Sequence, residues 1–268
     1  MALNFLVSNE RDGHIGDIFA VSAAPDGAVL YSAGADGALR QWNAESQELL
    51  STHDAAEDPL WRVALSPDAQ TLACSTASGT LRVYGLASPM TTPTLDATLP
   101  TRSQFGMCIA YSPDGGSICT GHKGGDIYLF DTVAGKLRHT LAGQSATVRA
   151  VAFSPGSSLI AAAGDGPCIT IHDTRSGEQR KSLLYTSAQR QSAITSLAWN
   201  QTGELLLTAS TDGKVKVWHV ERGECLCTLT ESTGPVFTAC WAKRGKLEGF
   251  VVGGAESKLR FYLPTTAT

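Results

Sequence analysis

The chain repeats one pattern of apolar runs and turns six times along its 268 residues. In each copy a first apolar run ends at a turn, a second run follows, and a third run comes after another turn. The residue at the first turn serves as a ruler, and it recurs at intervals of 42, 46, 42, 46 and 42 residues. The ruler positions are Pro25, Pro67, Pro113, Pro155, Gln201 and Lys243. A period of this length predicts that each copy is one structural unit.

The runs and the turns between them predict strands joined by tight hairpins. Turns such as Pro25-Asp26-Gly27 and Thr211-Asp212-Gly213 carry the proline, aspartate and glycine that tight turns favour. The runs are rich in β-branched and aromatic residues, and no long window has the period of a helix. We therefore predict an all-β fold in which six small sheets are the blades of a β-propeller. One such sheet cannot bury both of its faces alone, so the blades must pack against one another.

The period also sets the expected blade boundaries and the expected core. The blades should occupy residues 8–54, 55–102, 103–142, 143–187, 188–230 and 231–263 of one single domain. The last blade lacks an outer strand of its own, and we expect residues 2–7 to supply it, which closes the ring and covers an open sheet edge. Positions seven, four and two before the ruler should be buried. In the first blade these are Ile18, Val21 and Ala23.

Composition removes several classes of function. The net charge of −4 and the absence of a basic stripe disfavour direct nucleic-acid binding. Seven cysteines at irregular spacing, with no zinc-type pairing of Cys and His, indicate free buried thiols in a reducing compartment, and neither a metal nor a cofactor is expected. No apolar stretch approaches the length of a membrane span, and the first residues do not have the pattern of a secretion signal.

The repeat resembles that of WD-repeat propellers, whose units of about 40–45 residues end in a Trp-Asp-like dipeptide such as His172-Asp173 here. The resemblance implies a structural hydrogen-bond network within a blade. Its members in the first blade would be His14, Asp36 and Trp42, with Gly34 at the position where the family usually has Ser or Thr. In the fifth blade the same offsets hold Ser210, Asp212 and Trp218, and Arg190 stands near the histidine position. We interpret these residues as structural, because no nucleophile motif accompanies them.

A second set of residues is the candidate site. The position six before the ruler holds Phe19, Trp61, Met107, Arg149, Thr195 and Phe237, and two positions earlier stand Asp17 and Phe105. In a propeller these side chains lie around the mouth of the central channel. Aromatic anchors beside an arginine are typical of protein-binding hot spots. We expect a partner-binding ring of Asp17, Phe19, Trp61, Phe105, Met107, Arg149 and Phe237. The alternative is that these side chains fold inward and cap the channel.

Some runs are more specific than general propeller patterns. Asp17–Ser22 and the segment from Ser103 to Gly115 resemble the WD-repeat subunit of the Ski (superkiller) complex and its relatives, as do Val148–Pro155 and Thr208–Trp218. The resemblance implies a non-catalytic scaffold that joins a helicase and a TPR protein and supports 3′-to-5′ mRNA decay by the exosome. It implies a cytoplasmic protein, with nuclear roles in transcription elongation and in meiotic recombination among the relatives.

One departure from that family concerns the number of blades. The family has seven, whereas this chain shows six units, and the unit after Trp42 resembles the third of the family. Either a ring of six blades closes or one unit has been lost from this version of the chain; we predict six. Two other functions stay open. The chain could be another WD-repeat adaptor, such as a ubiquitin-ligase substrate receptor, a histone reader or a transcription-elongation scaffold, or it could be a propeller hydrolase.

Overall fold

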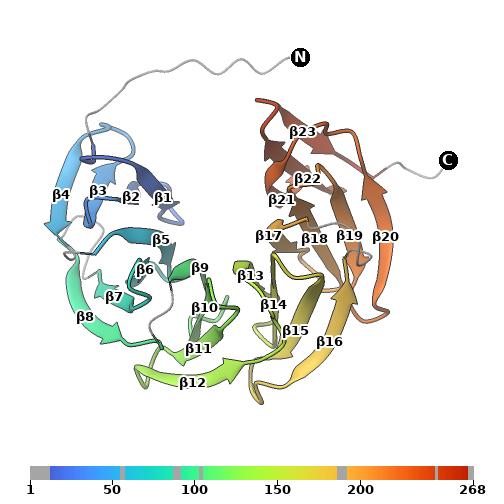
Figure 1. The fold of residues 1–268 in the computed structure, drawn as a ribbon. Helices are drawn as coiled ribbons and strands as arrows, with labels where there is room; N and C mark the ends of the chain where they lie inside the picture. Colours follow the sequence, from blue (N-terminus) through green and yellow to red (C-terminus); the bar gives the residue numbers. More distant parts are fainter. Residues whose placement is uncertain are drawn as a thin grey trace.

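The computed structural model describes residues 13–54, 58–86, 92–102, 105–185, 192–244 and 247–264. Within these ranges every helix or strand that the structure contains is a β-strand. The strands form five four-stranded sheets and one three-stranded sheet, all antiparallel, and the sheets are arranged around a common axis (Figure 1). The predicted all-β propeller architecture is confirmed.

Each of the first three sheets consists of strands that follow one another in the chain. The first holds β1 (Ile18–Ala23), β2 (Val29–Gly34), β3 (Ala38–Asn43) and β4 (Leu49–Asp54). The second holds β5 (Leu60–Leu65), β6 (Thr71–Thr76), β7 (Leu81–Gly85) and β8 (Thr94–Leu99). The third holds β9 (Gly106–Tyr111), β10 (Ser117–His122), β11 (Ile127–Asp131) and β12 (Lys136–Leu141).

The last three sheets continue the same order. The fourth holds β13 (Val148–Phe153), β14 (Leu159–Gly164), β15 (Cys168–Asp173) and β16 (Gln179–Leu184). The fifth holds β17 (Ile194–Trp199), β18 (Leu205–Ser210), β19 (Val215–His219) and β20 (Glu224–Leu229). The sixth holds β21 (Val236–Arg244), β22 (Leu247–Gly254) and β23 (Leu259–Tyr262). Each sheet lies inside the range expected for its blade.

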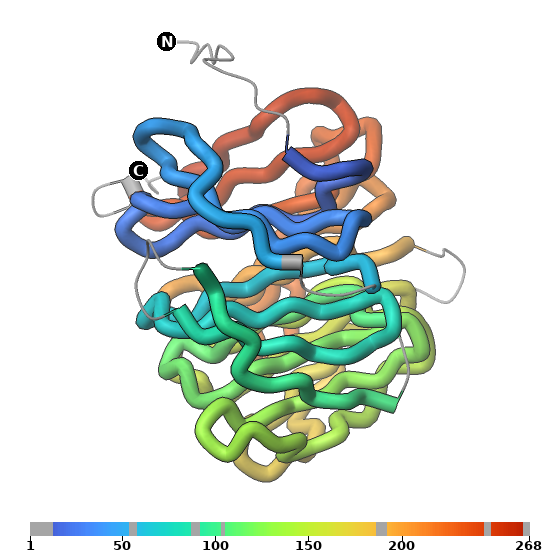
Figure 2. The backbone as a smooth tube through the Cα atoms, turned by 90° about the vertical axis from the view of Figure 1, so that its left-hand side faces the viewer, coloured from blue at the N-terminus to red at the C-terminus, as the bar shows by residue number. Residues whose placement is uncertain are grey.

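The hydrophobic core is divided into layers between neighbouring blades. Five clusters of buried side chains each join one blade to the next, from the first and second blades to the fifth and sixth. In the first layer Tyr31 of one blade and Tyr84 of the next are almost completely buried. The first strands of successive blades also pack side by side near the axis. Figure 2 shows the first two blades from the side, lying one against the other.

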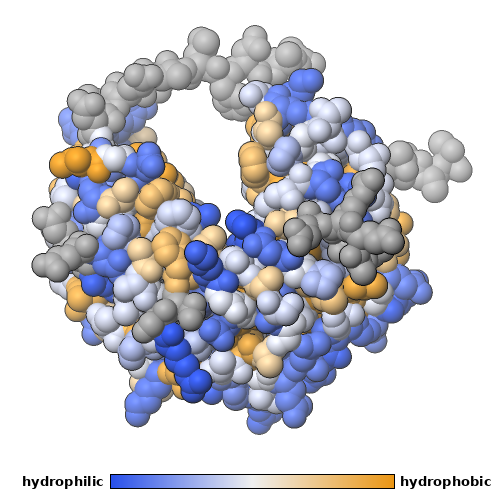
Figure 3. Space-filling view, in the orientation of Figure 1, coloured by the Kyte–Doolittle hydropathy of each residue, from blue (hydrophilic) through white to orange (hydrophobic). Residues whose placement is uncertain are grey.

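The ring is open in the part of the chain that the structure describes. β1 packs against β5, and β21 packs against β17, but no comparable packing joins β21 to β1. The opening lies between the first and sixth blades in Figure 1, and Figure 3 shows that side chains of the described residues do not fill it. The expected closing strand, residues 2–7, lies outside the described residues. Within the described residues β23 is therefore an edge strand of the sixth sheet.

The prediction that Ile18, Val21 and Ala23 are buried is wrong. Ile18 is 53% exposed, Val21 is 64% exposed and Ala23 is also exposed. The corresponding Leu60 of the second blade is fully buried, because it packs against the blade before it. The first blade has no blade before it in the described structure, so the same sequence pattern leaves its side chains exposed to water.

A chain of hydrogen bonds ties together the strands of the first blade. The ring of His14 contacts Asp36 through Nδ1 at 2.8 Å and the hydroxyl of Ser32 through Nε2 at 2.7 Å, and Trp42 donates its indole N–H to Ser32 at 2.9 Å. The hydroxyl thus comes from Ser32, and Gly34 is a glycine for a steric reason. A Cβ at Gly34 would lie 2.5 Å from the carbonyl oxygen of Asp17 and 3.1 Å from Nδ1 of His14.

The fifth blade forms only part of the expected network. Ser210 accepts a hydrogen bond from the backbone N–H of Asp212 at 3.4 Å. Trp218, however, donates its indole N–H to Thr208 at 3.2 Å. The hydroxyl that serves the tryptophan is thus Thr208, not Ser210, just as it is Ser32 in the first blade. Arg190, which we placed near the histidine position, lies outside the described residues.

Asp36 provides a test of the network. Burial acts to raise the pKa of the Asp36 carboxyl, but hydrogen bonds from His14, Arg40 and the backbone N–H groups of Ile15 and Ala38 outweigh it and hold the pKa well below its usual range. We expect Asp36→Asn to lower the free energy of unfolding at pH 7 by about 1–3 kcal/mol.

This effect of Asp36→Asn should depend on pH. Above an ordinary aspartate pKa of about 3.9 both states of the wild type are ionised, and the stabilisation is complete. Below it the unfolded carboxyl binds a proton that the folded one does not, so the stabilisation declines. Denaturant unfolding at pH 7 and at pH 3.5 measures the change, with Asp26→Asn in an exposed turn as the control. An equal difference between wild type and Asp36→Asn at both pH values would contradict this assignment.

His172 lies at the third-strand position that holds tryptophan in the first and fifth blades. It is fully buried, neither ring nitrogen has a hydrogen-bond partner among the described residues, and burial lowers the pKa of its imidazole. Replacing it by phenylalanine removes two buried polar atoms without partners. We expect His172→Phe to raise the free energy of unfolding by about 1–3 kcal/mol.

The gain from His172→Phe should be larger at pH 5 than at pH 8. Below an ordinary histidine pKa of about 6.5 the unfolded wild type binds a proton that the folded state resists, so the wild type loses stability as the pH falls. Phenylalanine does not titrate. Thermal unfolding across this range measures the difference, and a gain that does not grow toward pH 5 would show that His172 is not held neutral by the fold.

Candidate functional site

A β-bulge marks the start of the first strand in all six blades. The register of the first strand against the second shifts at the position six before the ruler in each sheet. The residues at the six bulges are Phe19, Trp61, Met107, Arg149, Thr195 and Phe237. A bulge breaks the alternation of side chains between the two faces of a sheet and redirects the side chain that it carries. The bulges therefore explain why the residue six before the ruler does not follow the burial pattern of its neighbours in the strand.

A backbone hydrogen bond holds the chain just before each bulge. The carbonyl oxygen eight residues before the ruler accepts a bond from an N–H at the end of the second strand, at 2.8–3.0 Å in every blade. The six acceptors belong to Asp17, Pro59, Phe105, Thr147, Ala193 and Pro235. Each bulge thus lies between this bond and the strand ladder, and its geometry is repeated around the axis. The ring positions are parts of the rigid sheets.

Three aromatic side chains of the predicted ring contact one another across three blades. The rings of Phe19 and Trp61 have centroids 4.3 Å apart, and those of Trp61 and Phe105 are 4.9 Å apart and nearly perpendicular. All three side chains are half-buried. They form a continuous apolar surface, which we call the aromatic cluster (Phe19, Trp61 and Phe105). Its central member, Trp61, has a buried indole N–H without a hydrogen-bond partner among the described residues.

Arg62 holds the aromatic cluster in place, although it is not a member of the predicted ring. Its guanidinium donates to the carbonyl oxygens of Phe19 and Trp61, each at 3.0 Å, and lies 5.6 Å from the centre of the Trp61 ring. Burial lowers the pKa of Arg62, but a guanidinium stays charged at neutral pH. The signal in the sequence was a charged residue inside a strand that otherwise reads as core, between Trp61 and Val63.

The other members of the predicted ring do not join the aromatic cluster by ring contacts. Phe237 is 55% exposed, Met107 is half-buried and Asp17 is exposed. Arg149 is exposed and makes a two-point ion pair with Asp165, in which Nε bonds one carboxylate oxygen at 2.5 Å and Nη2 the other at 3.1 Å. This hydrogen bonding raises the pKa of Arg149. The ring is thus a half-buried aromatic surface on one side and separate exposed side chains on the other.

Ser32, His14 and Asp36 have the hydrogen-bond order of a hydrolytic triad, but their surroundings favour a structural role. Ser32 is only 5% exposed, and its hydroxyl already accepts the indole N–H of Trp42. A nucleophile must reach a substrate and have donors beside it to stabilise an oxyanion. The buried hydroxyl of Ser32 instead links Trp42 to His14 within one blade.

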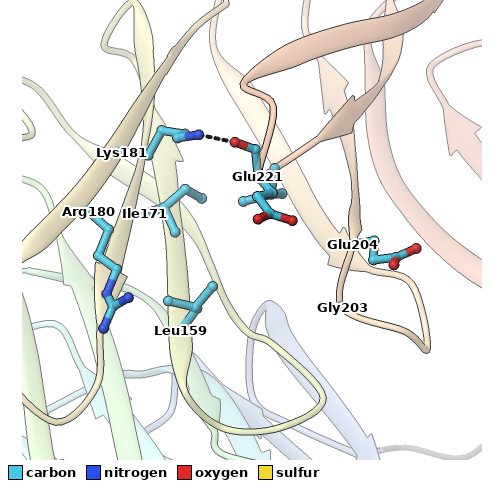
Figure 4. A pocket seen from close by; sticks show the side chains of 8 residues that line it. Leu159, Ile171, Arg180, Lys181, Gly203, Glu204 and Glu221 are labelled. Carbon is cyan, nitrogen blue, oxygen red and sulfur yellow. Dashed lines mark hydrogen bonds between the residues drawn. The ribbon is translucent and has the colours of Figure 1, made fainter.

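A pocket of about 420 Å³ lies at the junction of the fourth and fifth blades (Figure 4). It is lined by Leu159, Ile171, Arg180, Lys181, Gly203, Glu204, Val220 and Glu221. Lys181 spans it and donates a hydrogen bond to the carbonyl oxygen of Glu221. Gly203 belongs to the turn that ends the first strand of its blade, so the pocket lies on the face opposite the bulges. The described residues contain neither a group of side chains that could hold a metal ion nor a helix that could cross a membrane.

Comparisons with known proteins agree with this architecture. The pattern of the "WD domain, G-beta repeat" family matches residues 6–43 and 46–85, and that of the "Anaphase-promoting complex subunit 4 WD40 domain" matches residues 151–244. Meiotic recombination protein rec14 of Schizosaccharomyces pombe is 38% identical over 127 residues, which are 47% of this chain and 41% of that protein.

Two more distant relatives match different lengths of the chain. Human striatin-4 is 26% identical over 81% of this chain and 30% of its own length. WD repeat-containing protein VIP3 of Arabidopsis thaliana is 26% identical over 52% of this chain and 46% of its own length. The chain thus spans less than half the length of each of these relatives. Six repeats, the propeller of antiparallel sheets and these matches together show that the chain is a WD-repeat protein.

Proposed function

We propose that this protein is an interaction scaffold that holds a short apolar segment of a partner protein at the mouth of its channel. The observation that carries the proposal is the aromatic cluster, in which Phe19 and Trp61 stand on rigid bulges and Phe105 lies just before one, with Phe237 exposed on the far side of the opening. Aromatic side chains fixed by the backbone bind a partner at a low cost in conformational entropy.

The finer proposal is a scaffold of the Ski type. In that role the chain would join a TPR protein and a helicase and support 3′-to-5′ decay of mRNA in the cytoplasm. The resemblance of the first-blade and third-blade runs to that family supports it. A binding role for the channel mouth and a structural role for the polar networks also fit a non-catalytic scaffold. The aromatic cluster uses residues from both of those runs, since Phe19 and Phe105 belong to them.

A second candidate is a role in meiotic recombination, with the protein acting in the nucleus. The similarity to the meiotic recombination protein rec14 favours it. Both candidates use the same surface, so they differ in the partner and not in the mechanism. Loss of the gene would separate them. Reduced meiotic recombination with normal mRNA turnover would favour this candidate, and the reverse result would favour the Ski-type scaffold.

Affinity capture tests the site and the family of partners together. We expect wild-type protein to recover a helicase and a TPR protein from lysate, and Trp61→Asp to recover at least about ten-fold less of both, because a charge would lie inside the aromatic cluster. Val133→Asp is the matched control, since Val133 is 94% exposed in a turn at the rim. Equal recovery by Trp61→Asp and wild type would reject the site. Recovery of neither protein by wild type would reject the Ski-type assignment.

Phe237 separates the binding interpretation from the capping interpretation. If its ring binds a partner, Phe237→Ala should weaken recovery several-fold while the melting temperature stays within about 2 °C, because an exposed side chain contributes little to stability. If the ring caps the channel, the same substitution should lower the melting temperature and leave recovery unchanged. Differential scanning fluorimetry beside the capture experiment distinguishes the two outcomes.

A further inference from the structure

The opening between the sixth and first blades has two apolar walls. On the sixth blade the wall contains Cys240, Val251, Leu259 and Phe261, and on the first blade it contains Ile18, Val21, Leu30 and Trp42. We call these the gap walls. Figure 3 shows hydrophobic side chains along both sides of the opening.

The repeat itself shows how unusual the wall of the sixth blade is. Leu259 begins the third strand and is 58% exposed, whereas the equivalent residues of the other five blades are at most 2% exposed. These equivalents are Leu39, Leu81, Ile127, Ile169 and Val215. Two residues later Phe261 is 65% exposed, while the equivalent Leu129, Ile171 and Val217 are at most 6% exposed. In those blades the residues are covered by the next sheet along the ring.

The wall of the first blade shows the same contrast on the opposite face. Ile18 is 53% exposed, and its equivalents Val148, Ile194 and Val236 are at most 1% exposed. Val21 is 64% exposed, whereas its equivalents Leu197 and Ala239 are at most 9% exposed and Val63, Ile109 and Val151 are half-buried. Those residues are covered by the preceding sheet. The two walls are therefore the two halves of ordinary blade junctions, each without its other half.

We propose that the gap walls bind a four-stranded antiparallel sheet of a partner protein, which inserts as one further blade. Its two faces must both be apolar, because one face covers Leu259 and Phe261 and the other covers Ile18 and Val21. Recognition rests on this apolar shape, since charged side chains on the strands of both walls are already paired. Arg40, on the same face as Val21, bonds Asp36. Arg260 bonds Glu256 and the carbonyl oxygen of Glu231. An isolated sheet with two apolar faces is not stable in water, so it must be joined to a larger protein.

A second copy of this chain does not fit the opening as well as a single sheet does. The only sheets of the described structure with a free apolar face are the first and the sixth. The other face of each is already packed against its neighbour, β5 or β17. Such a sheet could cover one wall but would bring its neighbouring blade into the opposite wall. An inserted sheet must instead be free on both faces.

A blade here needs four strands of about six residues and their turns. A single strand paired along the edge of β23 would not cover the faces that hold Phe261 and Val21, so the occupant is a complete sheet. The inference concerns these faces and does not rest on the proposed function of the channel mouth.

A fusion tests whether the gap accepts a sheet. A second copy of the fifth blade, residues 192–231, joined after Pro264 by a flexible linker should raise the melting temperature by about 5 °C or more and remove most binding of the dye ANS. Phe261→Asp in the fusion should abolish both changes, and Val133→Asp should leave them intact. A fusion whose melting temperature and dye binding equal those of the parent chain would overturn the proposal.

Photo-crosslinking in cells tests the occupant. With p-benzoylphenylalanine at position 261 or at position 21 of the full chain, both positions should crosslink to one segment of about 40 residues in one partner polypeptide, and position 133 should not. Crosslinks only to residues 1–12, only to a second copy of this chain, or to nothing would overturn the proposal. Trp61→Asp should still give both crosslinks, because the gap walls hold the inserted sheet even when the channel mouth is empty. Failure of the channel-mouth site therefore does not remove them.

Discussion

Face-to-face packing of neighbouring sheets is the interaction on which the rest of this structure depends. Each blade has two apolar faces, and packing against the next blade around the axis covers one of them. Small side chains allow a close approach: Ala161, Ala162 and Ala163 on β14 are fully buried, between the third and fifth blades. The five layers fix the position of every first strand. The site at the channel mouth is rigid because those strands are.

The bulges turn this packing into a binding surface. A regular strand alternates its side chains between two faces, and in a propeller both faces are core. One extra residue at the start of the first strand points to neither face, so that position can change freely between blades. Phe19, Thr195 and Arg149 occupy it without disturbing the layers. Variation at one position of a repeated scaffold therefore yields a varied surface, and here three blades gather their aromatic residues on one side.

The sequence predicted features that depend on local order better than features that depend on a distant neighbour. The period located all six first strands, and turn residues such as Pro155-Gly156 marked their ends, because hairpin geometry is set by a few adjacent residues. The burial of Ile18 could not be predicted in the same way, since it depends on a sheet that the described structure does not place beside it. Arg62 was missed because its role lies in the carbonyl groups it reaches, one of them in another blade. The hydroxyl that accepts the hydrogen bond from Trp42 is likewise set by the space beside Gly34, which a local pattern does not reveal.

The channel mouth and the gap walls lie next to each other. Phe237 and Phe19 belong to the two blades that border the opening, so they are the ring positions on either side of it. An inserted sheet with the same inner strand would place its own side chain between them and extend the aromatic cluster from Phe19 toward Phe237. A ligand at the mouth would then contact both proteins, and each would strengthen the binding of the other by the same factor. In a scaffold of this design, assembly with one partner completes the surface that holds the next.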